Sequence, residues 1–188
     1  MRVDYFSTRF YIFENIYDNK ILTDLLNTIK KDTHNLAVVA SEPDGGPSYK
    51  TNYCIKDSHW SLFEPIVSEL NLHLEKESMQ FEVSNAPWYS EYGEHDGHPP
   101  HIHDQKQINI MEVRNAFKYS CIINLSNFGA TSFQNPNYTN WDMHEMKMES
   151  VYGKVILFPS NLLHWVNPHG YSGRIRATFS MNGLLHLE

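Results

Sequence analysis

The sequence has little of what would place it in several common classes of protein. It contains only two cysteines, Cys54 and Cys121, far apart and without a CxxC pair. Two buried, reduced thiols are therefore expected rather than a disulfide or a cysteine zinc site. No apolar run approaches the roughly 18–20 residues that a membrane span needs, and the alternating start with Asp4 is unlike a signal peptide. We expect a cytoplasmic protein.

Basic residues are also scarce. Fifteen Lys and Arg stand against 22 Asp and Glu, for a formal net charge of −7. Broad binding to a nucleic-acid backbone needs a basic face, so it is not expected, although one arginine could hold a nucleobase or a small anion. With 188 residues, of which 41% are hydrophobic, the chain can bury a real core. No repeat or composition break divides it, which predicts one domain over residues 1–188.

Helical periodicity is confined to the N-terminal eighty residues. Residues 18–31 form one amphipathic stretch, with Asp18 as its N-cap. Residues 58–77 form a second, where Ser61 and Glu64 suit a capping box. The Gly- and Pro-containing segment 41–52 between them indicates a loop. We interpret residues 1–80 as support, made of helices and some strand, for the C-terminal part of the chain.

Short runs rich in β-branched and aromatic residues begin at about residue 80. They cover residues 81–92, 107–113, 117–126, 130–134, 153–159 and 174–185. Helices followed by many short strands favour a mainly β, α+β architecture, in which an antiparallel sandwich or barrel is backed by helices. Residues 81–188 are the predicted β core.

Histidine is the outlier of the composition, with eleven residues. His101 and His103 are two positions apart, which on an extended segment places both imidazoles on one face. The preceding Pro99-Pro100 pair favours that extended geometry. His95 and His98 lie before the prolines and are interpreted as solvent or rim residues.

A shared metal would need a third ligand from elsewhere, and His164 is the best candidate. It follows a hydrophobic strand and a proline turn. Non-haem iron oxygenases build their two-histidine, one-carboxylate site in this way, from a short pair and a distant histidine. Here His103 stands where the carboxylate is usual, and Asp104 is the alternative ligand. The competing interpretation is a histidine-rich loop that binds stray metal or nothing, because an HxH motif is short.

Residues 174–182 alternate cleanly between polar and apolar side chains. Two of the five arginines, Arg174 and Arg176, fall on the polar face. That face can point to water. In a barrel with a functional interior it can instead point inward, where a guanidinium would grip a carboxylate with two hydrogen bonds.

The order of these elements resembles the Fe(II)/2-oxoglutarate-dependent oxygenase family of the type found in marine bacteria and their phages. The resemblance covers about the C-terminal hundred residues, and its most specific part is FPSNLLH followed by RATFSMN. The matching residues are Trp88, Gly93, His101, His103, the strand 119–125, Phe158, Pro159, Ser160, Leu162, His164, Arg176, Ser180 and Asn182.

The resemblance implies a double-stranded β-helix (a jelly-roll, cupin-like core) that uses Fe(II), O₂ and 2-oxoglutarate as a small-molecule co-substrate. By position, Arg176 would receive the distal carboxylate of 2-oxoglutarate, with Thr178 and Tyr119 as further co-substrate contacts. Asn161 stands where Trp is usual in the family and Asp104 where Pro is common, which leaves the substrate and the middle ligand open. The expected substrate pocket comprises Trp88, Tyr92, Asn124, Trp165 and Asn182.

Several alternatives stay open at the level of sequence. A peptidyl side chain such as proline, a nucleobase and a small metabolite all suit such a site, in a bacterial or phage-infected cell. A homodimer is compatible with the sequence. A cupin-like non-oxidative enzyme or sugar-binding module would share the histidines but would not need Arg176 to point inward. A structural protein that is only stabilised by a bound metal ion would not consume O₂.

Overall fold

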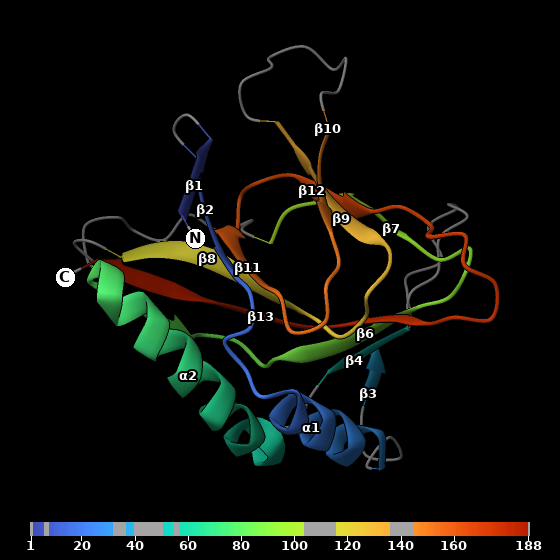
Figure 1. Ribbon diagram of the computed structural model, residues 1–188, viewed down its shortest axis with the longest axis horizontal. Helices are drawn as coiled ribbons and strands as arrows, with labels where there is room; N and C mark the ends of the chain where they lie inside the picture. The colour runs from blue at the N-terminus through green and yellow to red at the C-terminus, as the bar shows by residue number, and fades with distance from the viewer. Residues whose placement is uncertain are drawn as a thin grey trace.

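Two antiparallel sheets face each other, and helices cover the outer face of the larger one (Figure 1). The computed structural model describes residues 2–5, 8–31, 37–39, 51–54, 57–103, 116–135 and 145–187. Within these residues the expected mainly β fold with flanking helices is confirmed. The arrangement is that of a double-stranded β-helix, with the histidines and Arg176 between the sheets.

Among the described residues, the larger sheet has nine strands. β13 (Arg176–Leu187) lies at its centre, with β8 (Ala116–Asn124) along one side. β6 (Trp88–Tyr92) and β5 (Met79–Val83) pair end to end with the other side of β13. Beyond β8 come β11 (Val155–Pro159), β2 (Thr8–Phe13) and β1 (Arg2–Tyr5), and beyond β6 come β4 (Thr51–Cys54) and β3 (Ala37–Val39).

The smaller sheet has four strands, in the order β10 (Glu145–Glu149), β9 (Ala130–Gln134), β12 (His164–Val166) and β7 (His98–His101). It packs on the larger sheet through an apolar cluster that includes Phe10, Phe133 and Phe158. Aromatic rings from both sheets meet there, Phe133 and Phe158 with centroids 4.9 Å apart. This cluster closes one side of the space that holds the histidines.

The first helix matches its prediction, and the second differs. α1 (Asn19–Lys31) follows Asp18, whose Oδ1 accepts a hydrogen bond of 2.8 Å from the Lys20 backbone N–H, as an N-cap does. The predicted helix 58–77 divides into a 3₁₀ turn η2 (Asp57–Phe63), α2 (Glu64–Leu74) and a short η3 (Glu75–Glu77). The capping box was wrong: Phe63 is the N-cap and no side chain caps the helix, while Pro65 lies in its first turn.

Strand alternation on β13 sorts its side chains between two environments. Ala177, Phe179 and Met181 face the helices and belong to the main apolar core, as the alternation predicts. The same pattern predicts burial of Ile175, which is wrong: Ile175 precedes the strand and is exposed. Arg176, Thr178 and Ser180 face the smaller sheet and line a cavity there. Phe179 packs edge-on against Phe63, with centroids 5.2 Å apart, and so ties the strand to the helical layer.

Other strand predictions were partly right. The run 81–92 is interrupted at residues 84–87 and gives β5 and β6, and the run 107–113 lies outside the described residues. Residues 1–80 do more than support the core, because β2 pairs with β11 and β4 with β6 inside the same sheet. Among the described residues, no helix combines the length and apolar character needed to cross a membrane.

We expect the Phe179→Ala variant to lose about 3–5 kcal/mol of unfolding free energy, because it leaves a cavity between β13 and the helices. Phe117, on the neighbouring strand, is 53% exposed. The same truncation there should change the unfolding free energy by no more than about 0.5 kcal/mol. Urea denaturation of both variants measures the difference. Equal losses would contradict the assignment of Phe179 to the helix-facing side.

Candidate metal centre and its buried arginine

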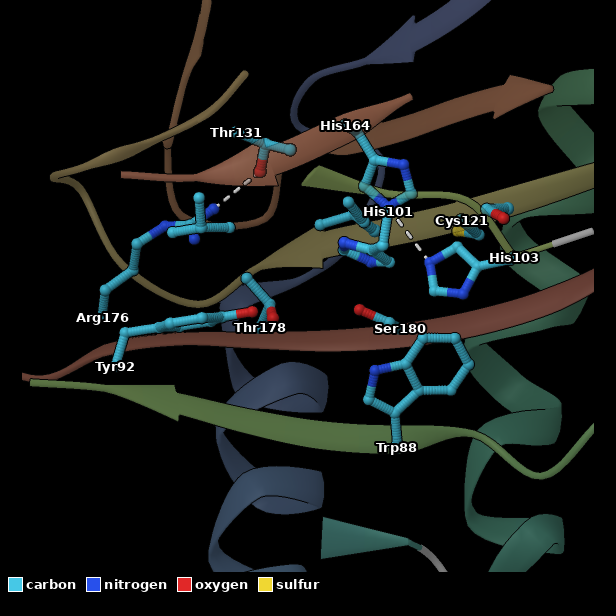
Figure 2. Close-up of a pocket in the computed structure, with 13 residues that line it drawn as sticks. Trp88, Tyr92, His101, His103, Cys121, Thr131, His164, Arg176, Thr178 and Ser180 are labelled. Carbon is cyan, nitrogen blue, oxygen red and sulfur yellow. Dashed lines mark hydrogen bonds between the residues drawn. The ribbon is translucent and has the colours of Figure 1, made fainter. Parts of the chain in front are cut away.

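Two neighbouring strands of the smaller sheet bring His101 and His164 together. His101, at the end of β7, and His164, at the start of β12, are direct partners in the strand pairing. His103 lies two residues beyond His101, and its backbone N–H donates a 2.9 Å hydrogen bond to the Ser160 carbonyl. That bond fixes the segment after β7 to the turn before β12, so all three imidazoles converge (Figure 2).

The distances between the imidazoles suit one shared ion. One ring nitrogen from each of His101, His103 and His164 lies within 4.8 Å of the others. Nε2 of His103 and Nε2 of His164 are 3.1 Å apart. Two nitrogens bound at right angles to one divalent ion, each at about 2.0–2.1 Å, would be roughly 3 Å apart. The cluster therefore has the spacing of a metal-binding triad.

Backbone carbonyls orient two of the rings. Nδ1 of His101 lies 2.9 Å from the Pro99 carbonyl oxygen, and Nδ1 of His164 lies 2.9 Å from that of Leu162. A carbonyl can only accept, so each Nδ1 carries a proton, and in a neutral ring Nε2 then keeps its lone pair. Burial, together with neighbouring imidazoles, lowers the pKa of His101 to about 2. The ring is therefore neutral near neutral pH, as a metal ligand must be.

Apolar rings enclose the triad. Phe158 packs edge-on against His164, with centroids 4.8 Å apart, and His164 is buried. Trp88 of β6 lies against His103, with centroids 5.3 Å apart. Such surroundings limit the access of water and fix ring orientations.

A buried arginine lies in the same cavity. Arg176 begins β13 and is only 1% exposed. Its Nε donates to Ser150 Oγ at 3.0 Å and its Nη2 to Thr131 Oγ1 at 2.8 Å. The guanidinium carbon lies 5.2 Å from the centre of the Tyr92 ring. Burial lowers the pKa of the guanidinium from its ordinary value, but an arginine remains charged inside a protein.

This charge lacks its usual compensation. Nη1 of Arg176 is buried and has no hydrogen-bond partner, and none of the described carboxylates forms an ion pair with the guanidinium. An uncompensated buried charge is costly. The cavity therefore has the chemistry of an anion site beside a metal-binding triad.

The structure brings together most of the residues that the sequence singled out. The cavity is lined by His101, His103, His164, Arg176, Thr178, Trp88 and Tyr92. Arg174 is exposed and lies against the Phe128 and Tyr171 rings, 5.6 and 5.8 Å from their centres. Asp104, the alternative ligand, is outside the described residues.

Four of the expected contacts do not line this cavity. Tyr119 belongs to the helical core, where its hydroxyl donates to the Arg9 carbonyl at 3.2 Å. Trp165 lies between His164 and Val166 on β12, and because both of these line the cavity, the Trp165 side chain is on the opposite face of the strand. Asn182 is not a lining residue itself, but its Oδ1 accepts a 2.8 Å hydrogen bond from Ser120, which lines the cavity.

The fourth, Asn124, lies behind Arg176, where its Oδ1 accepts from Ser150 at 2.9 Å. Sequence reasoning missed the hydroxyls that hold Arg176, Thr131 and Ser150. They come from β9 and from the residue after β10, and no motif marks either of them in the sequence.

Comparison with known proteins agrees with the fold. No family model matches the sequence, and no curated protein matches it. A prolyl-4-hydroxylase from Pseudomonas putida superimposes with a TM-score of 0.60 at 13% identity, covering 97% of this chain and 94% of that one. A prolyl hydroxylase from Trichoplax adhaerens, in complex with a hypoxia inducible factor oxygen degradation domain peptide fragment, gives 0.63 at 14%, covering 94% and 83%.

A third similar structure is HygX from Streptomyces hygroscopicus with nickel and 2-oxoglutarate bound. Its TM-score is 0.63 at 8% identity, over 96% of this chain and 84% of that one. The same protein has also been solved with hygromycin B bound. The chain thus has the double-stranded β-helix fold of the Fe(II)/2-oxoglutarate-dependent oxygenases.

We expect the His103→Ala variant to weaken divalent metal binding by more than about 100-fold, since loss of even an outer partner of a ligand costs 10–100-fold. Asp104→Ala should bind metal as the wild type does. His95→Ala, at an exposed histidine, is the matched control and should also bind metal as the wild type does. Anaerobic titration with Fe(II), read by calorimetry, compares the three variants. Retained affinity in His103→Ala together with lost affinity in Asp104→Ala would transfer the ligand role to Asp104.

Proposed function

We propose that this protein is an Fe(II)- and 2-oxoglutarate-dependent dioxygenase that hydroxylates an as yet unidentified substrate. One observation carries the proposal: three convergent histidines and a buried arginine without a carboxylate partner share one cavity. A sugar-binding or non-oxidative cupin-like module would not need the arginine. A purely structural metal site would need neither the charge of Arg176 nor its burial.

The donor set fits Fe(II). Imidazole nitrogens suit iron among the divalent metals, and three protein ligands leave coordination positions open for other groups. The lone pairs of His101 and His164 are already turned away from the backbone by their Nδ1 hydrogen bonds. Because His103 replaces a carboxylate, the site would be one charge unit more positive than the usual triad. That difference favours a dianionic co-substrate.

Arg176 fits the distal carboxylate of 2-oxoglutarate. Its Nη1 is the buried donor without a partner, and a carboxylate would satisfy it with a charge-assisted hydrogen bond. Thr178 is buried on the same face of β13, two residues along, and can add a hydroxyl. In a cavity shielded from water, this attraction is stronger than at the protein surface.

When bound together, Fe(II), 2-oxoglutarate and O₂ supply oxidative decarboxylation to succinate and CO₂, coupled to oxidation of a C–H bond. The protein's own residues hold the metal, orient the co-substrate and exclude water. Trp88 and Ser180 are cross-strand partners that line the cavity; Trp88 is four residues from Tyr92 on β6, and Ser180 is four residues from Arg176 on β13. We assign them to the substrate side.

The substrate class is the open part of the proposal. The prolyl hydroxylases among the similar structures support a peptidyl side chain such as proline, and the HygX complex with hygromycin B supports a small molecule. Two steps test the function itself. Anaerobic addition of 2-oxoglutarate to the Fe(II)-loaded protein should produce a weak visible charge-transfer band, and admission of air should then release succinate. A protein that binds iron but gives neither the charge-transfer band nor succinate is a binding module or a protein with a purely structural metal site.

We expect Arg176→Gln to raise the concentration of 2-oxoglutarate required for half-maximal succinate release by at least about 100-fold. Breaking one partner of a buried charge pair costs about 3–5 kcal/mol. Iron affinity should not change. Arg174→Gln, at an exposed residue two positions before β13 begins, should shift the requirement by less than about threefold. Equal shifts in the two variants would contradict the assignment of Arg176 as the anchor.

A further inference from the structure

A line of polar contacts continues behind Arg176, away from the cavity. Ser150 Oγ accepts a hydrogen bond from Nε of Arg176 and donates its own proton to Oδ1 of Asn124, at 3.0 and 2.9 Å. Asn124 is 1% exposed and Ser150 is 4% exposed. Asn124 ends β8 in the larger sheet, whereas Ser150 directly follows β10 in the smaller one. The contact therefore joins the two sheets at the point where the arginine is anchored.

The direction of each hydrogen bond in this line is determined. Nδ2 of Asn124 lies 3.2 Å from the Lys154 carbonyl oxygen. Since a carbonyl can only accept, the NH₂ end of the amide must face it, and Oδ1 must face Ser150. The Ser150 proton then points at Oδ1, which turns a lone pair of the hydroxyl toward Arg176. Without Asn124, nothing in this line would hold the hydroxyl in its accepting orientation.

The orientation of Ser150 determines which edge of the guanidinium is free. Nε and Nη2 together form the side edge of the arginine fork, and Ser150 and Thr131 occupy one donor on each. The end edge, made of Nη1 and the second N–H of Nη2, is left for a ligand, and Nη1 is the buried donor without a partner. Gly129 closes the approach from another side, because a Cβ placed there would lie 2.7 Å from Cδ of Arg176.

We propose that Asn124 is a positioning residue for co-substrate binding, which acts through Ser150 to present only the end edge of Arg176 to the distal carboxylate. The inference rests on the proposed function. A guanidinium held at both donors of its side edge cannot slide along the cavity, so the distance from the metal triad to the anion site is fixed. The pair therefore makes the site selective for one length of dicarboxylate.

Anaerobic calorimetry of the Fe(II)-loaded protein with 2-oxoglutarate tests this inference. Asn124→Ala should weaken 2-oxoglutarate binding by about tenfold, because the Ser150 hydroxyl is then no longer held with a lone pair toward the charged guanidinium, and a hydrogen bond to a charged group is worth about that much. Ser150→Ala should weaken it at least as much. Because the two residues act in series, the double variant should bind no more weakly than Ser150→Ala alone. The affinity for Fe(II) should stay at the wild-type value in all three.

Asn127→Ala is the matched control. Asn127 also holds the residues after β10, since its Oδ1 accepts from the Tyr152 backbone N–H at 2.7 Å, but it is not among the described hydrogen-bond partners of the Ser150 and Arg176 side chains. This variant should bind 2-oxoglutarate within about twofold of the wild type. An equal loss in Asn127→Ala, additive losses in the double variant, or a parallel loss of iron affinity would each reduce Asn124 to a purely structural role.

The outcomes for the inference and for the proposed function are separate. Wild-type protein that binds 2-oxoglutarate, with Asn124→Ala and Ser150→Ala binding equally well, overturns the positioning role and leaves the proposed function intact. Wild-type protein that binds iron but not 2-oxoglutarate overturns both. If Asn124→Ala does not fold, Ser150→Ala and the Asn127→Ala control still decide the question.

Discussion

The burial of the Arg176 charge is the constraint on which the cavity depends. A guanidinium that is 1% exposed must be compensated by the protein around it. In direct contact with it, the described residues supply hydroxyls and an aromatic face, from Thr131, Ser150 and Tyr92, and Glu149 attracts the charge without forming an ion pair. These groups come from both sheets, so the sheets must be packed together before the charge can be held. The compensation is also incomplete, which makes the site receptive to an anion.

The opposite end of the cavity is organised by neutral groups. His101 and His164 are oriented by backbone carbonyls, and burial keeps His101 uncharged. The cavity thus has a fixed positive charge at one end and three imidazole rings at the other. A ligand that is anionic at both ends, and can chelate a metal at one of them, matches this division. The structure separates the task of binding charge from that of binding metal.

The sequence predicted those parts of the site that depend on local periodicity. The side chains of β13 alternate with a period of two, so Arg176 and Thr178 could be assigned to one face and Phe179 to the other. Tyr119 was assigned from the resemblance, without considering on which face of β8 its side chain lies, and that side chain packs in the core beside the helices. Asn124 was expected in the substrate pocket, but its partner Ser150 follows a different strand. Contacts between sheets are set by three-dimensional packing and leave no pattern along the chain.

The position of β13 in the chain has a consequence for how the protein folds. This strand pairs with β5, β6 and β8, all of which precede it, and β2 near the start pairs with β11 some 140 residues later. Such non-local contacts make folding slow. During synthesis, β6 and β8 expose unpaired edges until β13 has left the ribosome, and exposed edges favour aggregation. Expression at low temperature, or with chaperones, should therefore matter more for yield than changes at the protein surface.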